Sequence, residues 1–226
     1  MENKDFEPVE QQLEENQPGR PVRRKKDGGW QKNVLLYLHD LVYLLSIVIL
    51  GLLLCFRVVV VSGTSMNNTL LDGDYLLLLS NTFYQDPQYG DIIVASKESF
   101  DDGKSIIKRV IATEGQWVDI DFEKGVVKIS DDGMNTWREL DEPYVNTPTN
   151  LQEGVQFPLY VKEGCLFVMG DNRNGSRDSR SPDIGLIDKR EVMGKVIFLL
   201  VPGTNGTDIY GQPLEERDYG RIGVVD

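Results

Sequence analysis

The sequence predicts a mainly β protein, in which one membrane-spanning helix precedes an antiparallel β domain. Three observations indicate this class. A single long apolar run, Val34–Phe56, lies near the amino terminus. Short runs rich in Val and Ile follow it, and turn signals such as Asp72-Gly73 and Lys124-Gly125 separate them, as in antiparallel sheets. With 226 residues, the chain is also long enough for one globular domain with its own core.

The first segment, residues 1–32, is polar and mixed in charge. It holds seven acidic and seven basic residues, together with Gln, Asn and Pro, and almost no large apolar side chains. Such a composition cannot bury enough apolar surface to offset the entropy of folding. We therefore expect a disordered cytoplasmic tail.

Residues 33–57 are predicted to form a transmembrane helix. The apolar run of 23 residues can cross about 30 Å of hydrocarbon as a helix. His39 and Asp40 fall in its first two turns and Arg57 at its far end, where polar groups can reach the interface. A cleaved secretion signal is the alternative, but the run exceeds the usual length of about 7–15 residues and no small-x-small site follows it. We expect an uncleaved anchor.

The charges flanking the run predict its orientation. Only Arg57 follows the run closely, whereas six cations precede it: Arg20, Arg23, Arg24, Lys25, Lys26 and Lys32. This asymmetry predicts a cytoplasmic amino terminus and an extracytoplasmic domain over residues 58–226. That domain has 28 acidic against 16 basic residues, which disfavours nucleic acid as a partner. We expect a single-pass protein of the cell membrane, in contact with lipid and monomeric.

The domain begins and ends with apolar or alternating runs that suit strands. The expected strands are Val58–Val61, Tyr75–Leu79, Asp91–Ala95, Ile106–Ile111, Trp117–Phe122, Val126–Ile129, Leu166–Met169 and Val192–Val201. Between the runs Val126–Ile129 and Leu166–Met169, the segment Ser130–Leu159 is polar and rich in turn residues. We expect residues 116–165 to form a small inserted subdomain without catalytic residues.

Two short segments carry the residues with the clearest chemistry. Ser65 lies in SGTSM, a few residues after the apolar run, and Lys108 lies in SIIKRVI among β-branched apolar neighbours. A lysine with its usual pKa of about 10.4 is protonated at neutral pH, so it can act as a base only after burial has lowered that value. The aliphatic neighbours offer such burial. Ser65 and Lys108 are therefore a candidate nucleophile and base.

Other common chemistries find no support in the sequence. There is no CxxC or HExxH pattern, so we expect no metal site and no cofactor. The single histidine, His39, lies in the apolar run, which argues against a Ser-His-Asp triad. Cys55 lies in the same run and Cys165 in the outer domain, so we expect no disulfide between them.

The segment Met169–Arg180, MGDNRNGSRDSR, is a hydrophobic strand that breaks into a polar loop. Loops held by a rigid sheet often carry functional residues. The simpler alternative is a solvated turn stabilised by a salt bridge between Asp178 and Arg180. The residues of this loop do not by themselves decide between the two.

Four segments taken together resemble the ordered signature boxes of type I signal peptidases. They are SGTSMNNTL (Ser62–Leu70), YGDIIV (Tyr89–Val94), IIKRVIATEGQ (Ile106–Gln116) and GDNRNGSRDSR (Gly170–Arg180). They follow an amino-terminal anchor, as in that family. The resemblance implies an antiparallel β catalytic domain of the signal peptidase type and a membrane-bound serine endopeptidase that removes signal peptides from exported preproteins.

The resemblance also implies roles for individual residues. Ser65 would be the nucleophile and Lys108 the general base, forming a Ser-Lys dyad. Ser176 matches the family serine that hydrogen-bonds and orients the lysine. Asp178 and Arg180 match the ion pair beside it.

Two further parts of the site follow from the same resemblance. The oxyanion would bind the backbone N–H of Ser65, with help from Gly63, which stands where some members have serine. The substrate would pair as an extended strand near Val58–Thr64 and Lys104–Lys108. Its small side chains would enter apolar pockets formed by Val61, Met66, Leu70, Ile106 and Ile107. For each of these five, ordinary core packing is the alternative.

The chain departs from the family pattern at two positions. Asn68 stands where the family usually has proline, and Ala112–Gln116, with Glu114, stands where GLPGD is common. Neither touches the reacting atoms, so the change bears on efficiency rather than class. The alternatives are a specialised Ser-Lys processing peptidase with a dedicated substrate, an anchored β-domain binding protein, and a catalytically inactive family member.

Overall fold

The computed structural model describes residues 29–97, 100, 103–204 and 217–225. Its single α-helix over these ranges is α1, Gly29–Cys55. By length and composition, Trp30–Cys55 could cross a membrane. The helix starts before the predicted residue 33, and Phe56 and Arg57 belong to the first strand because they pair with Leu79 and Leu78. The expected disordered tail, up to residue 28, lies outside the described residues.

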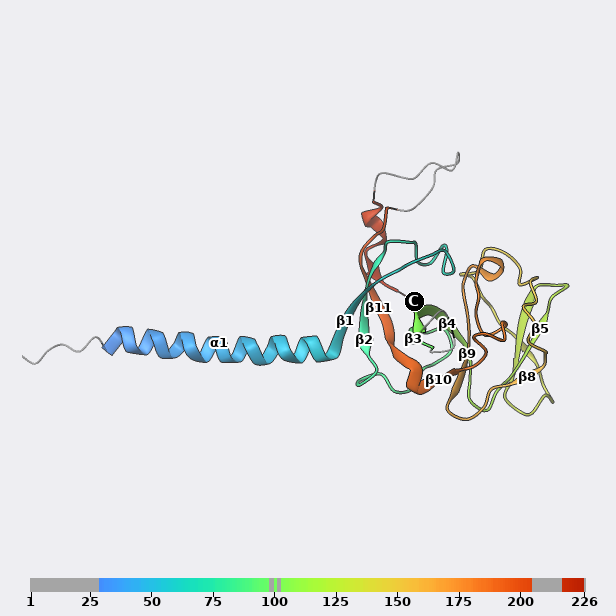
Figure 1. The fold of residues 1–226 in the computed structure, drawn as a ribbon, viewed down its shortest axis with the longest axis horizontal. Coiled ribbons are helices and arrows are strands. Elements are labelled where there is room, and N and C mark those ends of the chain that lie inside the picture. Colours follow the sequence, from blue (N-terminus) through green and yellow to red (C-terminus); the bar gives the residue numbers. More distant parts are fainter. Residues whose placement is uncertain (1–28, 98–99, 101–102, 205–216, 226) are drawn as a thin grey trace, which may run out of the picture. The chain divides into compact units, whose positions relative to one another are not determined.

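Two antiparallel sheets follow, which confirms the predicted fold class (Figure 1). The strands are β1 (Phe56–Val60), β2 (Tyr75–Ser80), β3 (Ile92–Ser96), β4 (Ser105–Thr113), β5 (Trp117–Asp121), β6 (Val126–Ser130), β7 (Arg138–Glu139), β8 (Leu159–Tyr160), β9 (Cys165–Met169), β10 (Ile187–Asp188), β11 (Val192–Val201) and β12 (Gly223–Val224). The two-residue strands β7, β8, β10 and β12 were not predicted, because so short a run carries no periodicity.

The larger sheet has the order β1-β2-β11-β3-β4-β9-β10, with β12 paired to β11. Strand β4 is the centre of the site. Its first half, Ser105–Arg109, pairs with β3, whereas β9 pairs with it only from Arg109 onward. The segment Ser105–Lys108 therefore keeps one edge without a partner among the described strands. Strand β1 is an edge strand of the same sheet.

The smaller sheet, β7-β6-β5-β8, is built from residues between β4 and β9. It falls within the range 116–165 where an inserted subdomain is expected. Its apolar face packs on the larger sheet through one buried cluster, in which Val118 and Ile129 from the small sheet join Ile111 and Phe167 from β4 and β9. This shared core packs β4 and β9 together, next to the loop that follows β9.

Candidate active site

Ser65 lies in the loop between β1 and β2, and both ends of that loop are pinned. Val61 N donates to Asp74 O at 2.9 Å, and Gly73 N donates back to Val61 O at 2.9 Å. Inside the loop, the side chains of Met66 and Leu70 are buried in the core. Apolar anchoring on both sides of the serine thus holds its hydroxyl in a defined position.

The loop after β9 fixes the same segment from the other side. Asn172 N donates to Ser65 O at 3.0 Å, and the Asn172 side-chain amide donates to Thr64 O at 3.0 Å. Gly170 lies between the two loops, where an added Cβ would come within 2.4 Å of Ser65 O and 2.2 Å of Ser176 Oγ. The two loops are therefore in direct contact at the candidate nucleophile.

Lys108 comes from the open half of β4 and is 4% exposed. Its Nζ lies 2.8 Å from Ser65 Oγ and donates to Ile107 O at 3.0 Å. Burial lowers the pKa of Lys108 to about 8, and the more distant charges of Asp178 and Asp171 oppose that shift. The amine can therefore lose its proton close to neutral pH and accept one from the serine hydroxyl.

Behind the lysine lies a buried network centred on Asp178. Asp178 Oδ2 accepts hydrogen bonds from Ser176 Oγ and Gly170 N, each at 3.0 Å. Arg180 donates to both carboxylate oxygens, with Nε and Nη2 each at 2.8 Å. The predicted contact between Asp178 and Arg180 is thus present, in a bidentate geometry that suits a buried ion pair.

Ser176 differs from the expectation. The ammonium of Lys108 has Ser65 and Ile107 as its hydrogen-bond partners within the described ranges, and the Ser176 hydroxyl donates to Asp178 instead. The physical reason for this direction is that an ionised carboxylate is a charged acceptor, whereas a protonated amine has no lone pair with which to accept a hydrogen bond. Ser176 therefore contacts the lysine's surroundings rather than its nitrogen.

Gly63 also differs from its expected oxyanion role. Its N–H donates to Asp72 Oδ1 at 2.8 Å, so that donor is already occupied, and glycine has no side chain to replace it. Its φ of 99° lies in a region that favours glycine. By contrast, no acceptor takes the Ser65 N–H anywhere in the described part of the chain. Of the two residues expected to bind the oxyanion, only Ser65 therefore has an available backbone N–H.

A groove of about 450 Å³ contains both Ser65 and Lys108. Of the five predicted pocket residues, Val61, Met66, Ile106 and Ile107 line it. Leu70 is not among the lining residues and is fully buried in the core, because its backbone closes a helical turn on Met66. Val59, Val60, Ser62, Lys104 and Ser105 also line it, and they belong to the two segments near which the substrate is expected to pair. The sequence analysis missed Val94, Phe100 and Arg177, and no local pattern points to Phe100 or Arg177.

A second buried ion pair was also missed. Arg109 donates to both oxygens of Asp171, at 3.0 and 2.9 Å, and Thr69 Oγ1 donates to Asp171 Oδ2 at 2.6 Å. The ring of Tyr144 stacks on Arg109, with its centroid 3.9 Å from the guanidinium carbon. This network ties β4, the serine loop and the loop after β9 together. The sequence signal for this ion pair was Arg109, the charged residue that follows Lys108 in β4.

Among the described residues, no group of three or more His, Cys, Asp and Glu is arranged to hold a metal ion. The site thus consists of a hydroxyl, a buried amine and their supporting hydrogen bonds. A hydroxyl that can pass its proton to an adjacent neutral amine is able to attack a carbonyl carbon.

Comparison with known proteins agrees with this chemistry. The family model described as signal peptidase, peptidase S26, matches residues 34–201. A probable signal peptidase I-1 of Synechocystis sp. is 32% identical over 171 residues, which cover 71% of this chain and 81% of that protein. A signal peptidase I of Bacillus licheniformis is 34% identical over 169 residues, with coverage of 69% and 83%.

Two further proteins are similar to this chain. A probable thylakoidal processing peptidase 2 of Arabidopsis thaliana is 29% identical over 156 residues, which cover 66% of this chain and 39% of that protein. The crystal structure of a signal peptidase I from Enterococcus faecalis aligns with a TM-score of 0.39 at 28% identity, covering 49% of this chain and 96% of that chain. The family match over residues 34–201, with relatives above 30% identity, confirms the resemblance found in the sequence. The chain therefore belongs to the signal peptidase family, peptidase S26, and is a serine peptidase of the type I signal peptidase class.

Proposed function

We propose that Ser65 and Lys108 form the catalytic dyad with which this signal peptidase cleaves preproteins. The observation that supports the proposal most directly is the 2.8 Å separation of Ser65 Oγ and Lys108 Nζ, with the lysine almost wholly buried. The pKa of about 8 leaves roughly a tenth of the amines neutral at pH 7, which is enough for a general base.

In the proposed acylation step, neutral Lys108 accepts the Ser65 proton as Oγ attacks the scissile carbonyl carbon. The tetrahedral oxyanion forms next to the Ser65 N–H. Lys108 then gives the proton to the leaving amine, the C–N bond breaks, and an ester joins Ser65 to the signal peptide. In deacylation, Lys108 takes a proton from water as the water oxygen attacks the ester carbonyl carbon. The bond between Ser65 Oγ and that carbon then breaks, Lys108 gives the proton to Oγ, and the signal peptide leaves with a free carboxyl group. Water thus replaces the proton that left with the amine, and the enzyme is unchanged after one turnover.

The groove supports binding of an extended peptide before the cut. One of its walls comes from the end of β1 and the residues after it, and the other from the open edge of Ser105–Lys108. A strand inserted between them gains backbone hydrogen bonds, which give affinity without sequence preference. Val61, Met66, Ile106 and Ile107 are apolar and line the groove, which supports the proposal that they form pockets for small apolar side chains.

The proposed arrangement in the membrane rests on the chain's charge and hydropathy. In this arrangement, residues 1–32 lie in the cytoplasm. The membrane span falls within residues 33–57, and its helix ends at Cys55. Residues 58–226 are the extracytoplasmic catalytic domain, with its subdomain at about 116–165. The apolar helix suggests anchoring in a lipid membrane. We further propose that the enzyme acts as a monomer and does not bind nucleic acid, given its acidic domain.

One alternative remains within the same chemistry, a peptidase dedicated to one substrate. Family membership argues against the anchored binding protein, and the contact between Ser65 and Lys108 argues against an inactive member. A broad preprotein panel distinguishes a general from a dedicated enzyme, because only the former cleaves most members.

The dyad is tested by assaying the detergent-solubilised full chain on a preprotein with a small-x-small site. Ser65→Ala, Lys108→Met and Lys108→Arg should each abolish cleavage, the last because guanidinium does not give up its proton. Lys162→Met, an exposed lysine outside the groove, should cleave like the wild type. Retained cleavage by Ser65→Ala or by Lys108→Met would contradict the proposal.

A further inference from the structure

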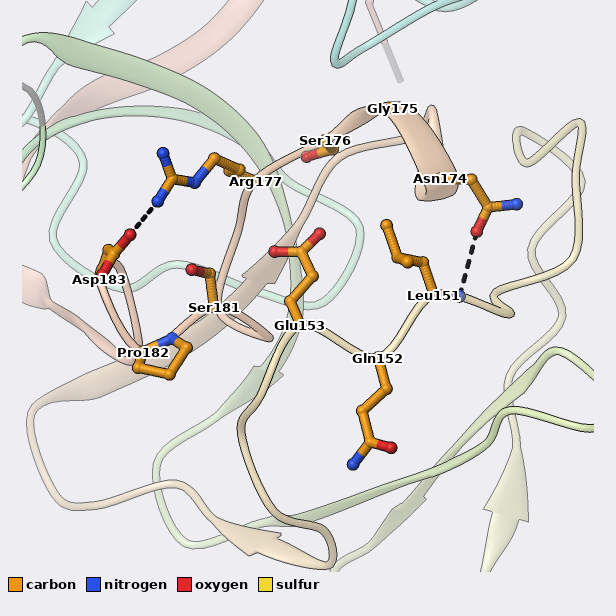
Figure 2. Close-up of a pocket in the computed structure, with 10 residues that line it drawn as sticks. All are labelled: Leu151, Gln152, Glu153, Asn174, Gly175, Ser176, Arg177, Ser181, Pro182 and Asp183. Carbon is orange, nitrogen blue, oxygen red and sulfur yellow. Dashed lines mark hydrogen bonds and ion pairs between the residues drawn. The ribbon is translucent and has the colours of Figure 1, made fainter.

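A second hollow, of about 610 Å³, lies beside the dyad and takes no part in the proposed mechanism. Figure 2 shows its lining, which comes from three short segments: Leu151–Glu153, Asn174–Arg177 and Ser181–Asp183. Most of these side chains are polar, unlike those of the groove. The hollow thus suits a charged or hydrogen-bonding ligand rather than an apolar one.

Glu153 lies between the other two segments in this view (Figure 2). Its side chain is 11% exposed, and its Oε2 is buried without a hydrogen-bond partner in the described part of the chain. Its Oε1 lies 3.6 Å from Arg180 Nη2. A buried carboxylate oxygen that lacks a donor costs free energy, and a cation bound beside the carboxylate would offset part of that cost.

The ion pairs around the site show that Glu153 lacks a cation of its own. Other buried or half-buried acids have one each: Asp171 has Arg109, Glu142 has Arg173, Asp74 has Arg221 and Asp91 has Lys195. Glu153 shares Arg180 with Asp178, which already holds that guanidinium in a bidentate pair at 2.8 Å. Two carboxylates therefore face one guanidinium.

The other cation in the lining of the hollow compensates Glu153 only in part. Arg177 is the cation in its lining, and it forms an ion pair with Asp183 on the same wall (Figure 2). Burial and the charge of Asp178 raise the pKa of Glu153, and Arg180, the backbone N–H of Asp178 and Arg177 offset this rise only in part. The ionised form of Glu153 is thus under-compensated, and a bound cation would stabilise it.

The position of the hollow indicates which part of the substrate reaches it. Ser176 lines the hollow, and Gly170 alone separates Ser176 from the backbone of Ser65, since a Cβ there would contact both. Arg177 lines the hollow and the groove alike. If the groove holds the residues before the cut, the chain after the cut starts at Ser65 and can continue past Ser176.

We propose that this hollow binds a basic side chain, lysine or arginine, from the first residues of the mature part of the preprotein, with Glu153 as its ionic partner. The inference rests on the proposed function of the dyad and adds a specificity-determining residue to it. An ammonium or guanidinium group in the hollow would pair with the Glu153 carboxylate, and the Ser181 hydroxyl offers a further acceptor in the same lining.

The experiment compares preproteins that carry a single Lys or a single Gln at each of the first several positions after the cut. With the full-length enzyme at pH 8 and low salt, Lys should raise kcat/KM by about five- to tenfold over Gln at one or two positions. Glu153→Gln should reduce that ratio to about one. Glu163→Gln, which removes the same charge from an exposed site outside the hollow, should preserve it.

A second measurement does not depend on the fold of any variant. A short peptide with the mature amino terminus should inhibit the wild type more strongly when it contains the Lys, and high salt should abolish this difference. No preference in the wild type, or an equal preference in Glu153→Gln, overturns the inference while leaving the dyad intact. Failure of the wild type to cleave any of the substrates, or cleavage by Ser65→Ala, would instead overturn the proposed function.

Discussion

Lys108 Nζ lies 2.8 Å from Ser65 Oγ, although 43 residues separate the two in the chain. The contact forms because β4 presents the lysine at its open edge while the loop after β1 folds back over that edge. Burial of the amine there lowers the pKa of Lys108 to about 8. The position and the protonation state of the base thus have one structural cause.

The first prediction concerns the dependence of activity on pH. Because only the neutral amine can accept the serine proton, kcat/KM should rise with pH and level off above about 8. The measurement is a pH series of initial rates with one preprotein at low concentration. An acidic limb near pH 10 would show that the lysine is not desolvated in the working enzyme.

The second prediction is that the buried amine lowers stability. The pKa of Lys108 is about 8 in the folded chain, against an ordinary value of 10.5 for a solvated lysine, so the folded state binds the proton less tightly than the unfolded state. The resulting cost is fully present below pH 8 and is gone above about 10.5. Lys108→Met should therefore raise the free energy of unfolding at pH 7 by about 1–3 kcal/mol.

Urea unfolding of the solubilised chain at pH 7 and at pH 11 measures this difference. The stabilisation should shrink at the higher pH, where the Lys108 amine is mostly neutral in both the folded and the unfolded wild type. Lys162→Met, an exposed lysine, serves as the control and should change little at either pH. An equal effect at both values of pH would attribute the stabilisation to packing rather than to charge.

The third prediction concerns Gly170, which separates the two loops of the site. In Gly170→Ala the new Cβ would lie 2.4 Å from Ser65 O and 2.2 Å from Ser176 Oγ, so the nucleophile's backbone must shift. A shift of this size should lower kcat by about 100-fold, because attack requires exact alignment.

The matched control is Gly223→Ala, where an added Cβ meets nothing within 4 Å. It should retain full activity. Thermal melting of both variants shows whether the loss at Gly170 comes from misplacement or from unfolding. Normal kcat in Gly170→Ala would mean that the serine loop can move without consequence.

The fourth prediction compares two ion pairs with the same spacing in the chain. Asp178 and Arg180 are both fully buried, so Asp178→Asn leaves a buried guanidinium without its main partner and should cost about 3 kcal/mol of stability. In the other pair, Arg190 is 90% exposed, and Asp188→Asn should cost much less because water solvates the guanidinium.

Denaturant unfolding of the two variants provides this comparison. Equal losses would indicate that burial contributes nothing to the effect. Asp178→Asn should also reduce activity, since Asp178 holds Ser176 and the backbone of Gly170 beside the dyad.

Much of this architecture can be predicted from local patterns. The apolar run of Val34–Phe56 predicts the helix because crossing hydrocarbon requires length and hydropathy, which are both local properties. The β-branched apolar residues of Ile106–Ile111 likewise predict β4. The boundary at residues 56 and 57 was wrong because pairing with β2, a tertiary interaction, decides it.

By itself, the sequence determined the fold class, the family and the two segments that carry Ser65 and Lys108, because these depend on residue order and short-range periodicity. Only the tertiary structure decided the hydrogen-bond partners: Ser176 with Asp178, Gly63 with Asp72, Leu70 in the core and Glu153 without its own cation. Partner choice depends on which donors, acceptors and charges distant segments bring within about 3 Å of one another, and no local pattern encodes such distances.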